Sequence, residues 1–148
     1  MRVLSTTPRR LELLLKGRSR RILTRHPAVG KWSIIEIMAH LSDAELALGW
    51  RFRNMMATPG VQLQWWDEHL WSEKCDYVHV PLKKSMATFR VLREANLALL
   101  RTAGTGAWES SYGIHEKRGQ TNIAELVIME AAHDLNHLLQ MKHLISLK

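Results

Sequence analysis

A stripe of residues at helical spacing near the end of the chain most constrains the fold. It runs from Ile123 to Leu144 in steps of three or four, so its side chains share one face of a helix. Most of its members are apolar and should face a core, yet Glu130, His133 and His137 belong to the same stripe. Because burial of an unpaired polar group costs free energy, these three side chains need partners or a ligand.

Three earlier segments have the same periodicity and lie between capping and helix-breaking residues. A cap supplies acceptors for the first backbone N–H groups of a helix, and proline or glycine interrupts the pattern. The bounding signals are Thr7-Pro8 and Pro27 for the first helix, the Ser33 to Glu36 capping box and Pro59-Gly60 for the second, Pro81 and Gly104 for the third, and Thr121 as N-cap of the fourth.

Two stretches between these helices lack a sustained period. Residues 61–80 contain Trp65, Trp66 and Trp71 and predict a long connection packed by its own aromatic side chains. A connection of this length permits the second and third helices to run parallel. Residues 105–120 are rich in glycine and predict a loop, and no segment alternates like a strand. The expected fold is an all-α four-helix bundle.

The composition fits one domain, residues 1–148, with no membrane partner. The chain has 46% hydrophobic and 24% charged residues, no apolar run long enough to span a bilayer and no secretory signal, so we expect a cytoplasmic protein. The single cysteine, Cys75, suits a reducing compartment. The net charge is +7, and eight basic residues fall in the first 25 positions. A non-enzymatic binding module using this basic first helix is therefore one hypothesis, although no nucleic-acid motif accompanies the cluster and nucleic acid is not the expected partner.

The histidines indicate a metal site. His133 and His137 are four residues apart on one helical face, as two ligands of one ion must be. His40, in line with the small residues Ala44 and Ala47 of the second helix, is the best third ligand. Three imidazoles leave a coordination position open, which is typical of a catalytic site.

Two other metal patterns compete with this interpretation. His133-Asp134 and His137 resemble the two-histidine helix of metalloproteases, but the general-base glutamate is replaced by a shorter aspartate. Glu130 and His133 form the Glu-x-x-His element of di-iron bundles, but no second copy is present, because Glu36 and His40 are four residues apart.

Several short motifs along the chain together resemble the DinB-like superfamily. They occur in the family's order from about Leu11 to Leu144: Trp32-Ser33, His40-Leu41, Asp67 to Trp71, Phe89-Arg90, Arg93, Gly113-x-His115 with Gly119, and His133-Asp134-Leu135-Asn136-His137 followed by Gln140. The resemblance implies an up-down-down-up four-helix bundle, often dimeric, with His40, His133 and His137 holding a divalent ion. It also implies metal-dependent chemistry, since characterised members include thiol-dependent S-transferases and a thiol-dependent isomerase.

These features lead to three functional hypotheses. The first is a metal-dependent enzyme in which the ion activates a low-molecular-weight thiol for S-transfer to a small molecule; the second is a metal-dependent hydrolase using metal-bound water; the third is the binding module. Zinc or nickel is the expected ion, with iron or manganese as alternatives. Glu130, Asp43 and Asp134, each three residues from a histidine ligand or next to one, could orient an imidazole or move a proton. Arg90 and Arg93 could bind a substrate carboxylate, and the tryptophans could wall the pocket.

Overall fold

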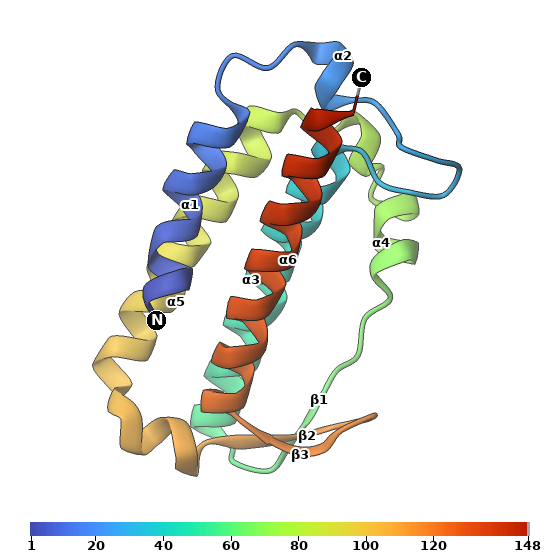
Figure 1. Cartoon of the computed structure of the whole chain (residues 1–148). Helices are drawn as coiled ribbons and strands as arrows, with labels where there is room; N and C mark the ends of the chain where they lie inside the picture. Colours follow the sequence, from blue (N-terminus) through green and yellow to red (C-terminus); the bar gives the residue numbers. More distant parts are fainter. Residues whose placement is uncertain (148) are drawn as a thin grey trace.

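Four long helices packed along one another make up most of the molecule (Figure 1). They are α1 (Arg2–Leu15), α3 (Ile34–Ala57), α5 (Leu82–Ser110) and α6 (Ile123–Ser146). The structure is a computed structural model that describes residues 1–147. A short helix, α2 (Arg20–Leu23), lies between α1 and α3. The predicted four-helix bundle is confirmed.

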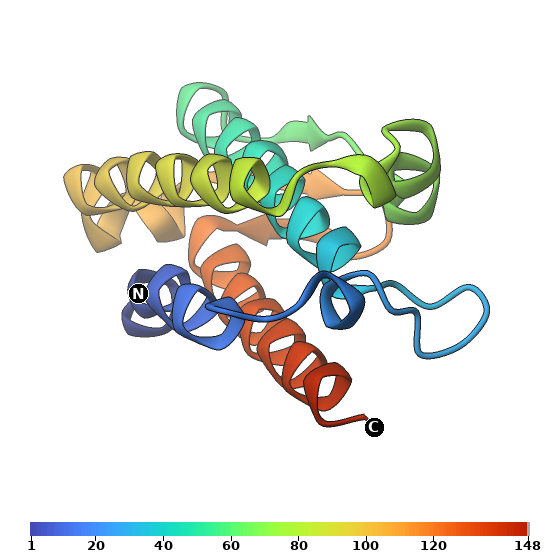
Figure 2. The ribbon, with the colours of Figure 1, turned by 90° about the horizontal axis from the view of Figure 1, so that it is seen from above.

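The direction of each helix can be followed along the chain in Figure 1. α1 runs upward, α3 and α5 both run downward, and α6 returns upward. α3 packs along α5, and α1 lies against α5 and α6, as the view from above also shows (Figure 2). The parallel pair α3 and α5 requires a connection that spans the length of the bundle. Within the described chain, no helix combines the length and apolar character needed to cross a bilayer.

This connection contains short elements of its own: β1 (Val61–Leu63), α4 (Glu68–Lys74) and the 3-10 helix η1 (Tyr77–His79). Asp67 caps α4 by accepting hydrogen bonds from the backbone N–H groups of His69 and Leu70, both at 2.9 Å. Aromatic packing occurs as expected, with the rings of Trp66 and Trp71 centred 4.6 Å apart. Trp65 remains 47% exposed.

The predicted start of the first helix is wrong. α1 begins at Arg2 and includes Pro8 in its interior. A proline lacks the N–H that would bond the carbonyl four residues earlier, so the Leu4 carbonyl loses its helical partner. That oxygen instead accepts a hydrogen bond at 3.0 Å from Nη1 of Arg93, which is buried in the bundle. The arginine therefore compensates for the missing helical bond.

The segment 105–120, expected to be a loop, consists largely of helix and strands. α5 continues past a kink at Gly104 (φ 74°, ψ 164°) to Ser110. There follow β2 (Tyr112–His115) and β3 (Gly119–Asn122), which form a three-stranded sheet with β1 in the order β1-β2-β3. Gly113 permits the close approach of β1, since a Cβ there would lie 2.5 Å from Leu63 Cδ2. The expectation of no strands was wrong because strands of three or four residues are too short to show alternation.

The N-cap of α6 lies one residue later than predicted. Asn122, whose side chain accepts from the Glu125 N–H, caps the helix, while Thr121 belongs to β3. The second helix begins as predicted: its N-cap is Ser33, and Glu36 completes the capping box. Glu36 Oε2 accepts from the Ser33 N–H at 2.8 Å and lies 2.7 Å from His26 Nε2.

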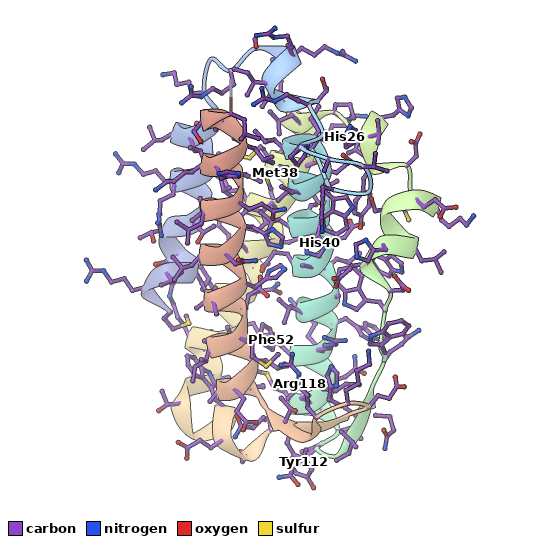
Figure 3. The ribbon with its side chains drawn as sticks, turned by 45° about the vertical axis from the view of Figure 1, so that its right-hand side comes forward. His26, Met38, His40, Phe52, Tyr112 and Arg118 are labelled. Carbon is purple, nitrogen blue, oxygen red and sulfur yellow. The ribbon has the colours of Figure 1, made fainter. Side chains whose placement is uncertain are left out.

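A layer of buried polar side chains divides the core into two apolar clusters. The cluster nearer the sheet includes Phe52, Met55, Leu100 and Ile123. The cluster at the other end includes the side chains Leu11, Ile37, Met38, Phe89 and Met141. Figure 3 shows Met38 and Phe52 at different heights, with His40 between them. The polar layer between the clusters consists of Glu45, Arg93, Asn96, Glu130 and Asp134 with the three histidines.

Candidate metal centre

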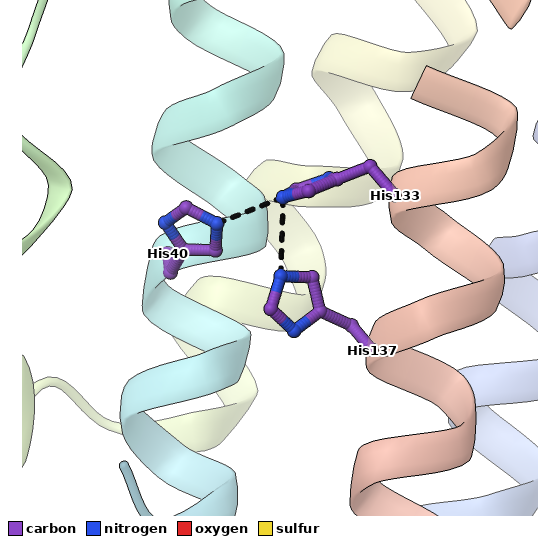
Figure 4. A group of neighbouring side chains, drawn as sticks. All are labelled: His40, His133 and His137. Carbon is purple, nitrogen blue, oxygen red and sulfur yellow. Dashed lines mark hydrogen bonds between the residues drawn. The ribbon is translucent and has the colours of Figure 1, made fainter. Parts of the chain in front are cut away.

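His40 from α3 and His133 and His137 from α6 converge on one point (Figure 4). The Nε2 atom of His133 lies 2.9 Å from Nε2 of His40 and 3.1 Å from Nε2 of His137. One nitrogen from each ring lies within 4.8 Å of the other two. His40 and His137 are only 3% and 8% exposed, and the His133 side chain is 30% exposed. The i, i+4 spacing brings His133 and His137 together on α6, and the packing of α3 against α6 adds His40.

The donor set fits a single divalent ion. Zinc bound by imidazole at about 2.0–2.1 Å in tetrahedral geometry holds its nitrogens roughly 3.3 Å apart, close to the spacing of these Nε2 atoms. His137 Nδ1 lies 2.8 Å from Gln140 Oε1, an acceptor, so this nitrogen carries the proton and Nε2 presents its lone pair. An ion held by all three rings would require the lone pair of each Nε2 atom to point at it, and its positive charge would offset the repulsion among those lone pairs.

The other two imidazoles are oriented differently. His133 Nδ1 lies 3.5 Å from Glu130 Oε1, which is an electrostatic contact longer than a hydrogen bond. Nδ1 of His40 is buried and has no hydrogen-bond partner among the described residues. The His40 ring instead packs against Trp32 and Trp66, with centroids 4.8 and 5.6 Å away. Aromatic contact therefore orients His40, and polar contacts orient the pair on α6.

Burial keeps two of the three rings neutral, which is the form that binds a metal. Burial, and then the charges of His133 and His137, lower the pKa of His40 to about 2. Burial and the charge of His133 lower the pKa of His137 to about 4. Burial also acts to lower the pKa of His133, but the contact with Glu130 and its charge outweigh that effect and raise it. Without an ion, an additional proton taken up by the triad would reside on His133.

The three carboxylates expected near the histidines have different partners. Asp134, fully buried, forms a bidentate ion pair with Arg93, with O–N distances of 2.6 and 2.9 Å. Glu130 lies between the Asp134–Arg93 pair and the histidine triad, with its Oε1 3.3 Å from Arg93 Nη2 and 3.5 Å from His133 Nδ1. Asp43 accepts a hydrogen bond at 2.6 Å from the hydroxyl of Tyr77 in η1. Of the three, Glu130 contacts a histidine of the triad, whereas Asp134 acts on His133 and His137 through its charge.

Arg93 is a core residue, contrary to the expectation that it binds substrate. It is 1% exposed and contacts Glu45 at 2.8 Å in addition to Asp134, Glu130 and the Leu4 carbonyl. Burial alone would lower its pKa, but these carboxylates raise it. Burial in turn raises the pKa of Glu45. The charges of Glu130 and Asp134 act on the adjacent histidines and favour a cation at the triad. Arg90 is exposed on α5.

A cavity of about 500 Å³ opens beside the triad, and His40, His133 and Glu130 form part of its wall. Glu68, Arg51, His115 and Arg118 also line it, and none of these had been singled out from the sequence as a site residue. Trp65 and Trp66 line it too, in agreement with the predicted aromatic wall. Arg51 could have been found, because it follows His40 by eleven residues and therefore lies on the same face of α3. Among the hairpin residues, His115 belongs to the Gly113-x-His115 motif of the family resemblance, whereas Arg118 had no comparable signal.

The two rival metal sites lack support in the geometry. In the metalloprotease-like pattern Asp134 would act as general base, but its carboxylate is paired with the guanidinium of Arg93. Glu130, His133 and Asp134 also lie close enough to share an ion, but Arg93 contacts both of these carboxylates. A di-iron site would need Glu36, which precedes His40 on α3, as a second carboxylate ligand. Glu36 instead accepts a hydrogen bond from Ser33 and contacts His26. The three-histidine group is the better candidate.

A four-helix bundle with a cavity-facing histidine triad defines a class of candidate metalloproteins, and the comparisons place this chain within it. The chain belongs to the DinB superfamily, whose family model matches residues 4–141. It shares its fold with YfiT from Bacillus subtilis, described as a probable metal-dependent hydrolase with an unusual four-helix bundle topology. The TM-score is 0.89 at 21% identity, covering 97% of this chain and 82% of that one. No curated protein matches the chain.

Proposed function

We propose that this protein is a metal-dependent enzyme in which His40, His133 and His137 hold one divalent ion and a small molecule reacts in the adjoining cavity. The observation that carries the proposal is the convergence of three Nε2 atoms, 2.9 and 3.1 Å apart, at the wall of that cavity. Nitrogen ligands suit zinc or nickel, with iron or manganese as alternatives. Such an ion, when bound, supplies Lewis acidity and lowers the pKa of a coordinated water or thiol.

The chain's own residues can supply the rest of a hydrolytic site. Glu68, at the start of α4, lines the cavity and lies close enough to His133 to raise its pKa electrostatically. We propose Glu68 as the group that accepts a proton from the attacking nucleophile. Glu130 orients His133 and is held in place by Arg93. The indole rings of Trp65 and Trp66 form part of the cavity wall.

Hydrolysis is favoured over thiol transfer. YfiT, which has the same fold, is described as a probable metal-dependent hydrolase, and Glu68 provides the base that hydrolysis needs. No contact in the described part of the cavity is specific for a thiol, so S-transfer with a low-molecular-weight thiol cosubstrate stays a prediction. Homodimer formation and a cytoplasmic location also stay predictions. An exposed apolar stripe on α6, formed by Ile128, Leu135 and Leu139, supports the dimer, which sedimentation analysis can test.

Metal analysis tests the site directly. We expect about one equivalent of a divalent metal in the wild-type protein and almost none in His137→Ala. His143→Ala is the matched control, because His143 is an exposed histidine on the same helix, and it should retain the metal. Equal metal content in the wild type and His137→Ala would sink the proposed site.

Activity assays then separate the reactions. The metal-loaded protein is incubated with a panel of esters and amides, and separately with thiols plus electrophiles. We expect hydrolysis that is lost in His137→Ala and reduced in Glu68→Gln. Thiol consumption without hydrolysis would instead establish the S-transfer alternative.

The binding-module hypothesis has a separate test. Part of the basic cluster is structural, since Arg25 Nη2 donates to the carbonyls of Leu144 and Leu147 at the end of α6. Binding to single-stranded and duplex DNA is measured over a range of salt concentrations. Absent or salt-insensitive binding would exclude a nucleic-acid function, because phosphate contacts give a salt dependence.

A further inference from the structure

The end of the cavity remote from the triad is lined by cationic side chains. Arg51 comes from α3, and Lys117 and Arg118 come from the turn of the β2–β3 hairpin, with His115 beside them. Figure 3 shows Arg118 near the hairpin end of the bundle and His40 about midway along it. The cavity thus has an imidazole end and a cationic end.

These cations lack acidic partners. Within residues 1–147, no carboxylate oxygen lies within 4.0 Å of Arg51, Lys117 or Arg118. Arg51 Nη2 donates to the Gln64 carbonyl at 2.7 Å, and Arg118 Nη1 contacts only the weak acceptor Met129 Sδ, at 2.6 Å. Arg93, by contrast, has three carboxylates.

The cationic groups are close enough to repel one another. Burial, and then the charge of Arg118, lower the pKa of Arg51. Burial, followed by the charges of Arg51 and Arg118, lowers the pKa of His115, with Glu116 as the one nearby acid that opposes this. A half-buried guanidinium held beside another cation is costly unless an anion binds between them. The arrangement is that of a preformed anion site.

The wall of the cavity between its two ends is apolar. Ala44, Ala47 and Leu48 of α3 face Leu126 and Met129 of α6. His40 and Arg51 are eleven residues apart, which is about 16 Å along a helix axis at 1.5 Å per residue. A ligand that reaches both ends therefore needs an apolar middle several bonds long.

We propose that the natural substrate is an amphipathic acid, with a carboxylate or phosphate bound by Arg51 and Arg118 and the reactive bond at the opposite, triad end. Two guanidiniums can bind either oxyanion through paired hydrogen bonds. Lys117, whose Nζ lies 5.2 Å from the centre of the Trp65 ring, adds charge at the mouth. The position of the reactive bond rests on the proposed metal-dependent function, whereas the anion site does not.

A binding experiment tests the anion site without any reaction. Three probes of similar shape, 4-phenylbutyrate, 3-phenylpropyl phosphate and the neutral 4-phenylbutyramide, are titrated into the full-length, zinc-free protein and followed by tryptophan fluorescence, since Trp65 and Trp66 line the cavity. We expect at least one anion to bind about tenfold or more tightly than the amide. Whichever anion binds more tightly identifies the group. Equal affinity for the amide and both anions overturns the proposal.

Variants show whether the named side chains are responsible. Arg51→Gln and Arg118→Gln should each lose most of the preference for the anion, while Arg101→Gln, an exposed arginine on α5, should keep it. Thermal unfolding checks that each variant is folded; Arg118 is exposed, so its replacement tests the site even if Arg51→Gln does not fold. An unchanged preference in Arg118→Gln contradicts the proposal.

The same variants distinguish this proposal from the metal function. Zinc affinity should be unchanged in Arg118→Gln and lost in His137→Ala, and zinc-free His137→Ala should still prefer the anion. If the protein binds no metal but retains the anion preference, the proposed enzyme fails and the anion site stands. If it binds metal and hydrolyses neutral and acidic esters equally, the anion site fails and the enzyme stands.

Discussion

The histidine triad and the Arg93 cluster are neighbours in one polar layer, yet they are built on opposite principles. Around Arg93, each carboxylate has a cationic partner, and even the carbonyl freed by Pro8 receives a donor. In the triad, three nitrogens face one another, and two imidazole Nδ1 atoms are buried without a hydrogen bond. The Arg93 cluster is closed and hydrogen-bonded, whereas the triad opens to a cavity and has ring nitrogens without hydrogen-bond partners.

The difference arises from the helical register of α6. Asp134 follows His133 directly, so the two side chains diverge by roughly 100° around the helix, and the carboxylate turns to α5 while the imidazole turns to α3 and the cavity. The ion pairs of Arg93 contribute to structure, whereas imidazole nitrogens that converge on one point indicate a bound ligand. The two groups therefore predict different responses to mutation.

Removal of Arg93 should have the largest effect on stability. Arg93→Met leaves three carboxylates and the Leu4 carbonyl without their donor, and loss of one partner of a buried ion pair costs about 3–5 kcal/mol. Urea unfolding of the zinc-free protein measures this cost. Arg90→Met, at an exposed position on the same helix, should change stability by less than about 0.5 kcal/mol. A similar small change in Arg93→Met would show that the cluster contributes little.

Zinc should stabilise the wild type through the triad alone. At a free zinc concentration of about 100 times Kd, a ligand that binds only the folded state adds about 2.7 kcal/mol to the free energy of unfolding. We expect this gain in the wild type and in His143→Ala, and its absence in His133→Ala. Thermal unfolding with and without zinc measures it. An undiminished gain in His133→Ala would mean that the ion binds elsewhere.

The triad could be predicted from sequence because it depends on local spacing and one long-range assumption. His133 and His137 at i, i+4 share a face whatever the tertiary structure, and His40 was chosen from its place on the second helix in line with Ala44 and Ala47, which the family resemblance supported. The four helices followed from periodicity in the same way. The parts predicted correctly are thus those governed by helix geometry.

The Arg93 cluster could not be predicted, because its members come from α1, α3, α5 and α6 and depend on how the helices pack. Pro8 looked like a helix start because its missing N–H is harmless there, and only a distant arginine makes it tolerable inside α1. The role of Asp134 was missed for the same reason. Lys117 and Arg118 at the cationic end of the cavity belong to a hairpin whose strands are too short to be predicted from an alternating pattern.

Gln140 tests how far the triad depends on its surroundings. Its Oε1 accepts the Nδ1 proton of His137 and fixes the metal-binding tautomer. Gln140→Ala should weaken zinc binding about 10- to 100-fold, which is about 1.4–2.8 kcal/mol, with little change in the stability of the zinc-free protein. Zinc affinity is measured by competition with a chelating dye. Gln140→Glu retains an acceptor and should bind zinc more tightly than Gln140→Ala; the reverse order would contradict the tautomer argument.

The smallest predicted effect concerns Asp43, which sequence spacing associated with His40 but which accepts a hydrogen bond from the buried Tyr77 hydroxyl. Tyr77→Phe removes this bond and should cost about 1–2 kcal/mol near pH 8, with zinc affinity unchanged in both Tyr77→Phe and Asp43→Asn.

Burial, the hydrogen bond and the charge of Asp43 all raise the pKa of Tyr77 above 10.0. A raised folded-state pKa contributes stability that is complete below pH 10 and is lost as the pH rises further, because the unfolded chain releases its proton first. Phenylalanine has no such proton, so the stability difference between the wild type and Tyr77→Phe should narrow above pH 10, as measured by urea unfolding from pH 8 to 11. Parallel pH dependences of the unfolding free energies of the two proteins would show that folding does not raise the pKa of this hydroxyl. Weaker zinc binding in Asp43→Asn would show that Asp43 contributes to the metal site.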